Sequence, residues 1–87
     1  MRIKPCYQLK NIAGDFVVIE SGSDVVDLAK SFLLNETAAF LFDAILKENE
    51  ASDLAELLKK EYDVTEEQAI KDVEEFITFL RQKDILE

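Results

Sequence analysis

The segment formed by residues 32–42 constrains the fold of this chain more than any other part of the sequence. It begins with Phe32, Leu33 and Leu34, a short apolar run that suits a β-strand. Asn35 follows at a position typical of a helix N-cap, where its side-chain oxygen can accept an unpaired amide hydrogen of the first turn. Because strand-like patterns precede Asn35 and helix-like patterns follow it, we expect the chain to change from a sheet to helices here.

The composition describes a small domain without the residues of most catalytic and metal sites. Of its 87 residues, 48% are hydrophobic, so we expect residues 1–87 to form a single domain around one core. The absence of histidine and the single cysteine, Cys6, exclude a Ser-His-Asp triad and the usual zinc ligand sets. We expect no enzymatic activity, no metal and no cofactor. The lone cysteine and the lack of a long apolar run are typical of a cytoplasmic protein.

The negative charge is concentrated in one part of the chain. The first 34 residues hold equal numbers of basic and acidic side chains, so the whole net charge of −9 belongs to residues 35–87. An acidic surface repels phosphate backbones. We therefore expect neither DNA nor RNA as a partner.

The part of the chain before Asn35 predicts three short strands. Residues 6–12 alternate between apolar and polar side chains, and residues 16–19 form a β-branched run after turn residues at 13–15, which together predict a hairpin. The third strand is predicted at residues 30–34, with Phe32 and Leu34 on one face and Leu33 on the other. Three such strands need a layer of helices to be stable.

The part of the chain after Asn35 predicts three helices. We expect them at residues 36–48, at 52–61 with Ser52 as the cap, and at 66–83, where Thr65 and Gln68 form a capping box. Two apolar stripes are predicted to face the core. They consist of Ala38, Leu41, Phe42 and Ile45 in the first helix and of Ala69, Ile70, Val73, Phe76, Ile77 and Leu80 in the third. Ile85 and Leu86 are expected to fold back onto the core. The order predicts an α+β, winged-helix-like fold, a three-stranded antiparallel sheet followed by a three-helix bundle.

Phe79 does not fit the stripe of the last helix. At about 100° per residue it lies to one side of the stripe, on a flank that also carries Asp72, Glu75 and Lys83. Phe76 lies between this flank and the core. Phe79 either covers the edge of a small core or lines a groove beside the sheet, since an aromatic residue among polar ones is typical of an interaction surface.

Five motifs, taken in order, resemble the PqqD family over essentially the whole chain. They are Tyr7-x-Leu9, Phe16-Val17-Val18-Ile19, Leu34-Asn35-Glu36-Thr37-Ala38-Ala39, Asp53-Leu54-x-x-Leu57-Leu58-x-x-x-Tyr62 and Asp72-Val73-x-x-Phe76-x-x-x-Leu80. The Leu-Asn-Glu-Thr-Ala stretch is the most specific of them. The helical spacings are common in helical proteins and become informative only in this order.

The resemblance implies a recognition element of ribosomally made, post-translationally modified peptides. Such a domain is a non-catalytic chaperone that binds the leader segment of a precursor peptide and presents it to a modifying enzyme, in many relatives a radical SAM maturase. The leader binds by β-augmentation as an extra strand on the third strand, which here consists of Lys30, Ser31, Phe32, Leu33 and Leu34. From the helical wheel we add Asp72, Glu75, Phe76, Phe79 and Lys83 as the peptide-binding face of the third helix.

Three other functions compete with this interpretation. A winged-helix DNA-binding protein would need a basic recognition helix, whereas the last helix is acidic. The sequence argues against an enzyme in its own right, because it contains no histidine and few nucleophilic side chains. A structural adaptor of a maturase that never contacts the peptide fits the sequence as well. An open edge strand can also pair with a second copy, so the sequence allows a monomer or an edge-strand homodimer.

Overall fold

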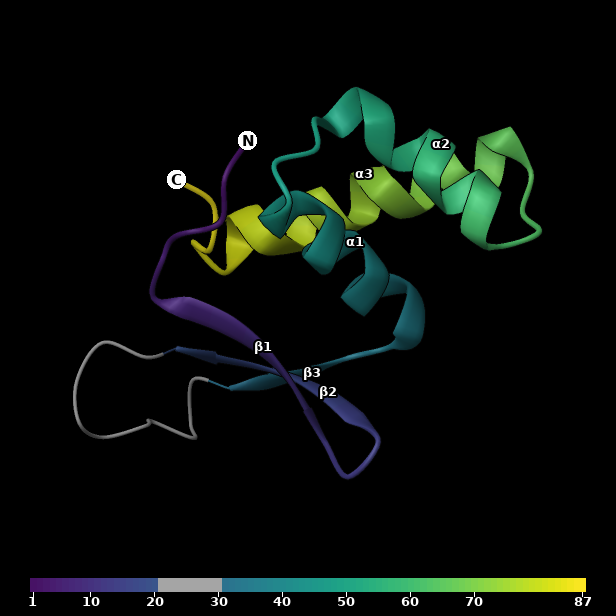
Figure 1. The fold of residues 1–87 in the computed structure, drawn as a ribbon. Coiled ribbons are helices and arrows are strands. Elements are labelled where there is room, and N and C mark those ends of the chain that lie inside the picture. Colours follow the sequence, from purple (N-terminus) through teal and green to yellow (C-terminus); the bar gives the residue numbers. More distant parts are fainter. Residues whose placement is uncertain (21–30) are drawn as a thin grey trace.

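The computed structural model describes residues 1–20 and 31–87 (Figure 1). Its strands are β1 (Tyr7–Ile12), β2 (Asp15–Glu20) and β3 (Phe32–Leu34), and its helices are α1 (Glu36–Leu46), α2 (Ala51–Glu61) and α3 (Glu66–Gln82). The strands form an antiparallel sheet in the order β1-β2-β3, and the three helices lie on one side of it, with α1 against its face. The predicted α+β architecture is confirmed.

The β1–β2 hairpin follows from a two-residue turn. Ala13 and Gly14 both have positive φ angles, 53° and 90°, as a type I′ turn requires. Such turns twist in the same sense as the strands, so Ile12 pairs directly with Asp15 across the turn. The predicted turn at residues 13–15 is therefore one residue too long, because Asp15 already belongs to β2.

β3 is shorter than the sequence analysis predicts. It begins at Phe32 instead of residue 30; Ser31 precedes it, and Lys30 lies outside the described residues. The first residue of β3 that pairs with β2 is Phe32, opposite Val18. Because the start of β3 depends on this pairing, the local apolar pattern could not locate it. The predicted faces are confirmed, because Phe32 and Leu34 are half-buried beneath the helices whereas 68% of Leu33 is exposed.

Two of the three predicted helix caps are confirmed. The Asn35 side chain accepts the amide hydrogen of Ala38 at 2.8 Å, and Thr65 accepts that of Gln68 at 3.1 Å. The predicted Thr65–Gln68 capping box is only half formed, because the Gln68 side chain donates to Asp72 instead. The prediction for α2 is wrong, since this helix begins at Ala51 with Glu50 as its N-cap residue.

The start of α2 has a specific physical cause. The Glu50 amide donates to the carboxylate of Asp53 at 3.4 Å, the reciprocal half of a capping box. Ser52 lies inside the first turn and is exposed.

The ends of α1 and α3 also differ slightly from the prediction. α1 ends at Leu46, two residues early, because Glu48 adopts a left-handed conformation with φ of 66°. The Asn49 side chain and the Asn49 backbone amide both donate to the Ala44 carbonyl, at 2.8 Å and 3.2 Å, and so satisfy one of the acceptors at the helix end. α3 ends at Gln82, one residue early.

A single core lies between the sheet and the helices. Its largest fully buried side chains are Phe42, Leu41, Ile45, Leu54, Leu58, Leu80, Ile85 and Val18. The predicted burial of Ile70 is wrong, because 44% of it is exposed, and in α1 Ala39 is buried where Ala38 was expected. The reason for the second difference is that α1 has neighbours on two sides: the sheet on one, and α2 and α3 on the other (Figure 1).

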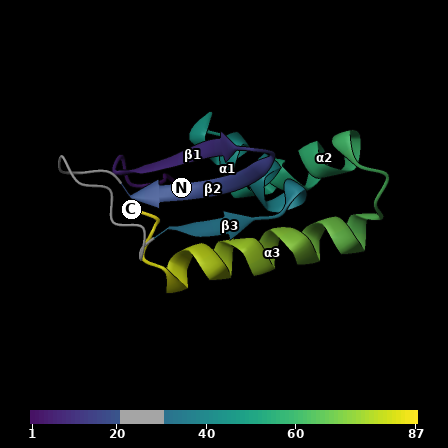
Figure 2. The same ribbon diagram turned by 90° about the horizontal axis from the view of Figure 1, so that it is seen from below.

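The two chain ends lie side by side next to the end of α3 (Figures 1 and 2). The Lys4 amide donates to the Ile85 carbonyl and the Glu87 amide to the Arg2 carbonyl, both at 2.9 Å. Ile85 is completely buried, as the sequence predicts. An ion pair of 2.9 Å joins the Lys4 ammonium and the Asp84 carboxylate, and this hydrogen bond raises the pKa of Lys4. The first residues thus fasten the end of α3 to the sheet.

α3 runs alongside β3, on the side away from β2 (Figure 2). Phe32 of β3 contacts Phe79 of α3, with the two ring centroids 5.4 Å apart. This arrangement leaves the free edge of β3 facing the flank of α3. In the part of the chain that the structure describes, no helix is long and apolar enough to cross a membrane.

Candidate functional site

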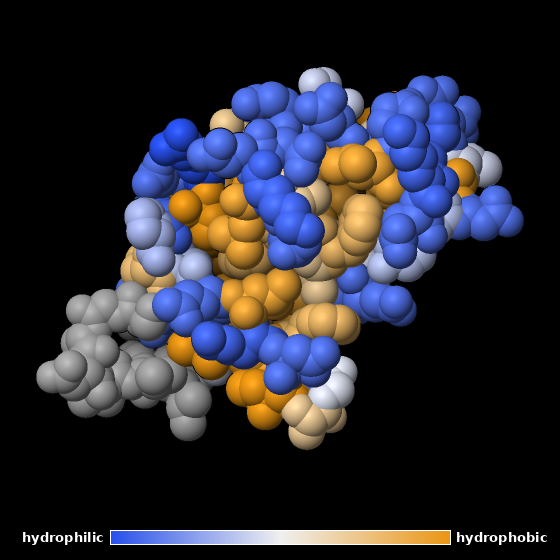
Figure 3. All heavy atoms as spheres, viewed as in Figure 1, coloured by the Kyte–Doolittle hydropathy of each residue, from blue (hydrophilic) through white to orange (hydrophobic). Residues whose placement is uncertain are grey.

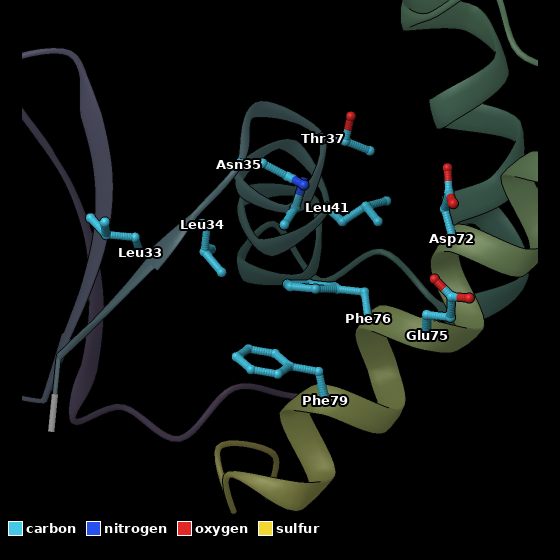
Figure 4. Close-up of a pocket in the computed structure, with 10 residues that line it drawn as sticks. Leu33, Leu34, Asn35, Thr37, Leu41, Asp72, Glu75, Phe76 and Phe79 are labelled. Carbon is cyan, nitrogen blue, oxygen red and sulfur yellow. The ribbon is translucent and has the colours of Figure 1, made fainter.

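A groove lies between β3, the start of α1 and the flank of α3 (Figure 4). It encloses a volume of about 380 Å³ and is open to solvent. Its lining residues come from all three elements: Leu33, Leu34, Asn35, Thr37, Ala38, Leu41, Asp72, Glu75, Phe76 and Phe79. A pocket of this size between secondary-structure elements, with an apolar floor and a few polar groups, is typical of a binding site.

The structure brings six of the ten predicted site residues together in this groove. They are Leu33, Leu34, Asp72, Glu75, Phe76 and Phe79. Three others, Ser31, Phe32 and Lys83, line a neighbouring hollow together with Tyr7, Glu20, Asp84 and Ile85. The tenth, Lys30, is outside the described residues. Burial raises the pKa of Tyr7 in this hollow, and the Glu20 carboxylate beside it adds to the effect.

Phe79 belongs to both of the environments that the sequence left open. Its ring meets Phe32 edge-on with centroids 5.4 Å apart and stacks on Phe76 at 6.4 Å. Phe76 is buried, whereas Phe79 is half-buried and lines the groove. Figure 4 shows both rings pointing from α3 toward β3. Phe79 therefore packs on the edge of the core and also offers apolar surface to the groove.

The strand pairing shows which backbone groups of β3 face the open edge. The two residues of an antiparallel pair either exchange both hydrogen bonds or turn these groups away from each other, in alternation. Tyr7 is paired with Glu20 in register, yet its amide donates to the Lys4 carbonyl at 3.1 Å, so this pair is of the second kind. Glu20 therefore directs its backbone groups toward β3.

The alternation can be followed from Glu20 along β2 to β3. By the same alternation Val18 directs its backbone N–H and C=O toward β3, whereas Ile19 and Val17 direct theirs toward β1. Leu33 lies opposite Val17, so its N–H and C=O point away from β2 to the free edge of the sheet. In the described residues the free edge of β3 therefore offers the donor and the acceptor of Leu33.

Sequence reasoning missed the contribution of α1 to the groove. Asn35, Thr37, Ala38 and Leu41 line it, because the cap at Asn35 turns the chain directly from β3 into α1. The helical-wheel argument considered only α3. The signal that could have located these residues was the Leu34–Ala38 motif itself, which joins the open strand to the first helical turn.

The groove has an acidic rim. Asp72 and Glu75 are the charged residues among those that line it, and no lysine or arginine does. Asp72 accepts the side-chain amide of Gln68 at 2.7 Å, which orients its carboxylate. Thr37 supplies a hydroxyl. Among the described residues no cluster of three or more histidine, cysteine or carboxylate side chains could hold a metal ion. The groove therefore offers apolar contacts, strand hydrogen bonds and negative charge.

Known proteins share both the sequence pattern and the fold. The family model described as "Coenzyme PQQ synthesis protein D (PqqD)" matches residues 20–86. No curated protein sequence matches the chain.

Two solved structures are similar to the fold. One is a lasso peptide synthetase B1 complexed with the leader peptide, with 24% identity, a TM-score of 0.75, and 97% of this chain and 93% of that chain covered. The other is TbiB1 in complex with the TbiA(beta) leader peptide, with 17% identity, a TM-score of 0.80, and coverage of 100% and 95%.

Proposed function

This chain belongs to the PqqD family, and from that premise we propose that it is a non-catalytic peptide chaperone. It binds the leader segment of a ribosomally made precursor peptide and presents it to a modifying enzyme. The observation that carries the proposal is the free edge of β3, which exposes the backbone groups of Leu33 beside an aromatic groove. The two solved structures share the fold and are complexes with leader peptides, which supports the same function.

The proposed binding mode is β-augmentation at β3. An extended peptide satisfies the open N–H and C=O of Leu33 and adds a fourth strand to the sheet. Its alternate side chains then point into the groove, where Leu34, Phe76 and Phe79 offer apolar contact. We propose the same role for Ser31, Phe32 and Lys83, which line the neighbouring hollow, and for Lys30, which lies outside the described residues. Because the leader orders on binding, its affinity stays moderate and release remains possible.

We also propose that the chaperone acts without chemistry of its own. The groove contains a threonine hydroxyl and two carboxylates, and its lining residues include no histidine, cysteine or lysine. The acidic rim disfavours a nucleic acid in the same place. The catalytic step therefore belongs to a second protein, and we propose a radical SAM maturase, the enzyme that the family resemblance implies. Co-purification of the chain with the maturase encoded beside its own gene tests this partner.

The peptide-binding proposal is tested by titrating the isotope-labelled chain with the leader of a precursor encoded beside its gene. We expect backbone amide shifts at Phe32, Leu33 and Leu34 and along the groove side of α3. A scrambled peptide of the same composition serves as the control. Absence of shifts with the authentic leader would contradict direct binding and favour an adaptor that contacts only the enzyme.

The same free edge offers a site for self-association. Under our proposal a leader and a second copy compete for Leu33, so the free chain is either a monomer or a dimer that the leader separates. Light scattering coupled to size exclusion, with and without leader, measures this. A dimer that keeps its mass when saturated with leader would place the dimer contact elsewhere.

A further inference from the structure

We propose that the peptide bound in the groove carries an apolar residue and, two positions along the strand, a lysine or arginine that pairs with Asp72 and Glu75. This inference rests on the proposed peptide-binding function and specifies its substrate. It follows from the order of apolar and acidic residues along the flank of α3. The sequence of the peptide is then constrained by two neighbouring subsites.

The apolar subsite is formed where β3 and α3 meet. Phe79 contacts Phe32 and stacks on Phe76, and Leu34 lines the same floor. Figure 4 shows the two phenyl rings and Leu34 around one space beside the strand. Leu33 points away from α3 in the same view. A peptide side chain that enters from the free edge would therefore be surrounded by apolar surface.

The acidic subsite begins one helical turn before Phe79, toward the N-terminus of α3. Asp72 and Glu75 are three residues apart, so they share one flank of the helix. Asp72 is half-buried and Glu75 is exposed, and the ion pairs between described residues include neither carboxylate. The lining residues contain no cation. The two negative charges at the rim thus have no cationic partner within the groove.

The spacing of the two subsites matches that of a β-strand. From Phe79 back to Glu75 the helix rises about 6 Å, at about 1.5 Å per residue. Two residues of an extended strand cover about 6.6 Å and point to the same face. A side chain opposite Phe79 is therefore accompanied, two positions away, by one opposite Glu75. A lysine or arginine at that position lays its aliphatic stem along the apolar floor and reaches the carboxylates with its charge.

In the experiment, peptides are selected from a displayed library of random dodecapeptides for binding to the intact chain and to two variants. Each variant replaces two carboxylates with neutral amides. The groove variant is Asp72→Asn with Glu75→Gln, in which residue 72 can still accept the Gln68 amide. The matched control is Asp63→Asn with Glu61→Gln, which removes the same charges from exposed positions outside the groove. Amide shifts of the labelled chain identify which selected peptides bind at Leu33.

Peptides that bind at Leu33 are expected to be enriched in lysine or arginine two positions from an apolar residue. On the groove variant we expect this enrichment to vanish and the affinity of a selected basic peptide to fall about tenfold, as for a partly shielded charged pair. The control variant should keep both. Circular dichroism verifies that each variant folds, and Glu75→Gln alone replaces the groove variant if it does not.

Two results would overturn the inference. If peptides bind at Leu33 without basic enrichment, or if the enrichment persists on the groove variant, the acidic subsite does not exist, whereas the peptide-binding function stands. If no peptide shifts the Leu33 amide, the proposed function fails and the inference fails with it. The two failures are therefore separated by the β3 amide signals.

Discussion

β1 and β3 form the two edges of the same sheet, and they differ in the properties that decide whether an edge strand pairs with another chain. β1 has six residues, carries Lys10, and its Tyr7 amide is already bonded to the Lys4 carbonyl. β3 has three residues, all apolar, and opens onto the groove beside α3. Figure 3 shows a row of hydrophilic side chains where β1 lies, with hydrophobic ones on either side of it.

The difference indicates that one edge is protected and the other is kept open. Lysine on an edge strand discourages pairing with a foreign strand, because the added strand would have to accommodate its charge. β3 has no such residue, and Phe79 and Phe76 stand next to it. An exposed apolar edge is a liability for aggregation unless a partner covers it. The contrast between the edges therefore supports peptide binding at β3 and not at β1.

The largest effect on this contrast is expected from Phe79→Ala. Loss of the aromatic wall should reduce leader affinity about 10- to 100-fold, the range of an interface hot spot. Because Phe79 also packs on Phe32 and Phe76, we expect the unfolding free energy to fall by about 1–2 kcal/mol. Isothermal titration calorimetry measures the first quantity and urea unfolding the second.

Ile70→Ala is the matched control for this change, since Ile70 is a large apolar residue of α3 that is 44% exposed and does not line the groove. It should leave the affinity unchanged. A Phe79→Ala variant that loses stability but keeps its affinity would make Phe79 a core residue only, and β3 would lose its advantage over β1.

The second effect compares the edges directly, with proline on each. Leu33→Pro removes the amide hydrogen that points to the free edge of β3 and leaves the bonds to β2 in place. We expect about tenfold weaker leader binding, from one lost hydrogen bond and the added steric conflict. Asn11→Pro is the control, because the same alternation turns the Asn11 amide to the free edge of β1.

Both proline variants must retain the far-UV circular dichroism of the parent chain for the comparison to hold. Equal losses of affinity in the two variants would show that the edges are equivalent, and equal retention would show that the leader does not pair with β3. Only a selective loss with Leu33→Pro agrees with β-augmentation.

Features set by neighbouring residues could be predicted from the sequence. Asn35 and Thr65 were identified as caps because a cap depends on a side chain and an amide three residues later. The failure at α2 has the same local origin: Ser52 competes with the Glu50–Asp53 box, and propensity alone does not decide between them. The α+β order followed from the periodicities, which change at Asn35.

Features set by distant contacts could not be predicted. The start of β3 depends on where β2 stops pairing, and the exposure of Ile70 depends on how α2 lies on α3. For the candidate site, the wheel placed Asp72, Glu75 and Phe79 on one flank of a single helix. That α1 completes the groove, with Asn35 among its lining residues, requires knowing how three elements meet in space.

The third effect concerns Asn35, the residue that follows β3 and caps α1. Asn35→Ala should lower the unfolding free energy by about 1 kcal/mol through the lost cap. Thr65→Ala removes the equivalent cap of α3, outside the groove, and should cost a similar amount. Thermal melts of both variants measure the caps. Because Asn35 lines the groove, its variant alone should also weaken leader binding, and the same binding loss with Thr65→Ala would attribute it to general destabilisation.

The smallest effect is a difference between the two edge strands in how they contribute to the pH dependence of the unfolding free energy. β3 consists of phenylalanine and leucine, which do not titrate, whereas β1 begins with Tyr7. Burial, aided by Glu20, raises the pKa of Tyr7. The folded state thus favours the neutral phenol, a stabilisation that is complete below the unfolded pKa of about 10 and is lost as the pH rises through the folded pKa. Urea unfolding at pH 8 and above pH 10 should therefore show a smaller alkaline loss of unfolding free energy for Tyr7→Phe than for the parent chain.

Burial also raises the pKa of Tyr62, so Tyr62→Phe should reduce this loss as well. If Tyr62→Phe reduces the loss and Tyr7→Phe does not, the alkaline sensitivity belongs to the helices and the edges do not differ in this respect.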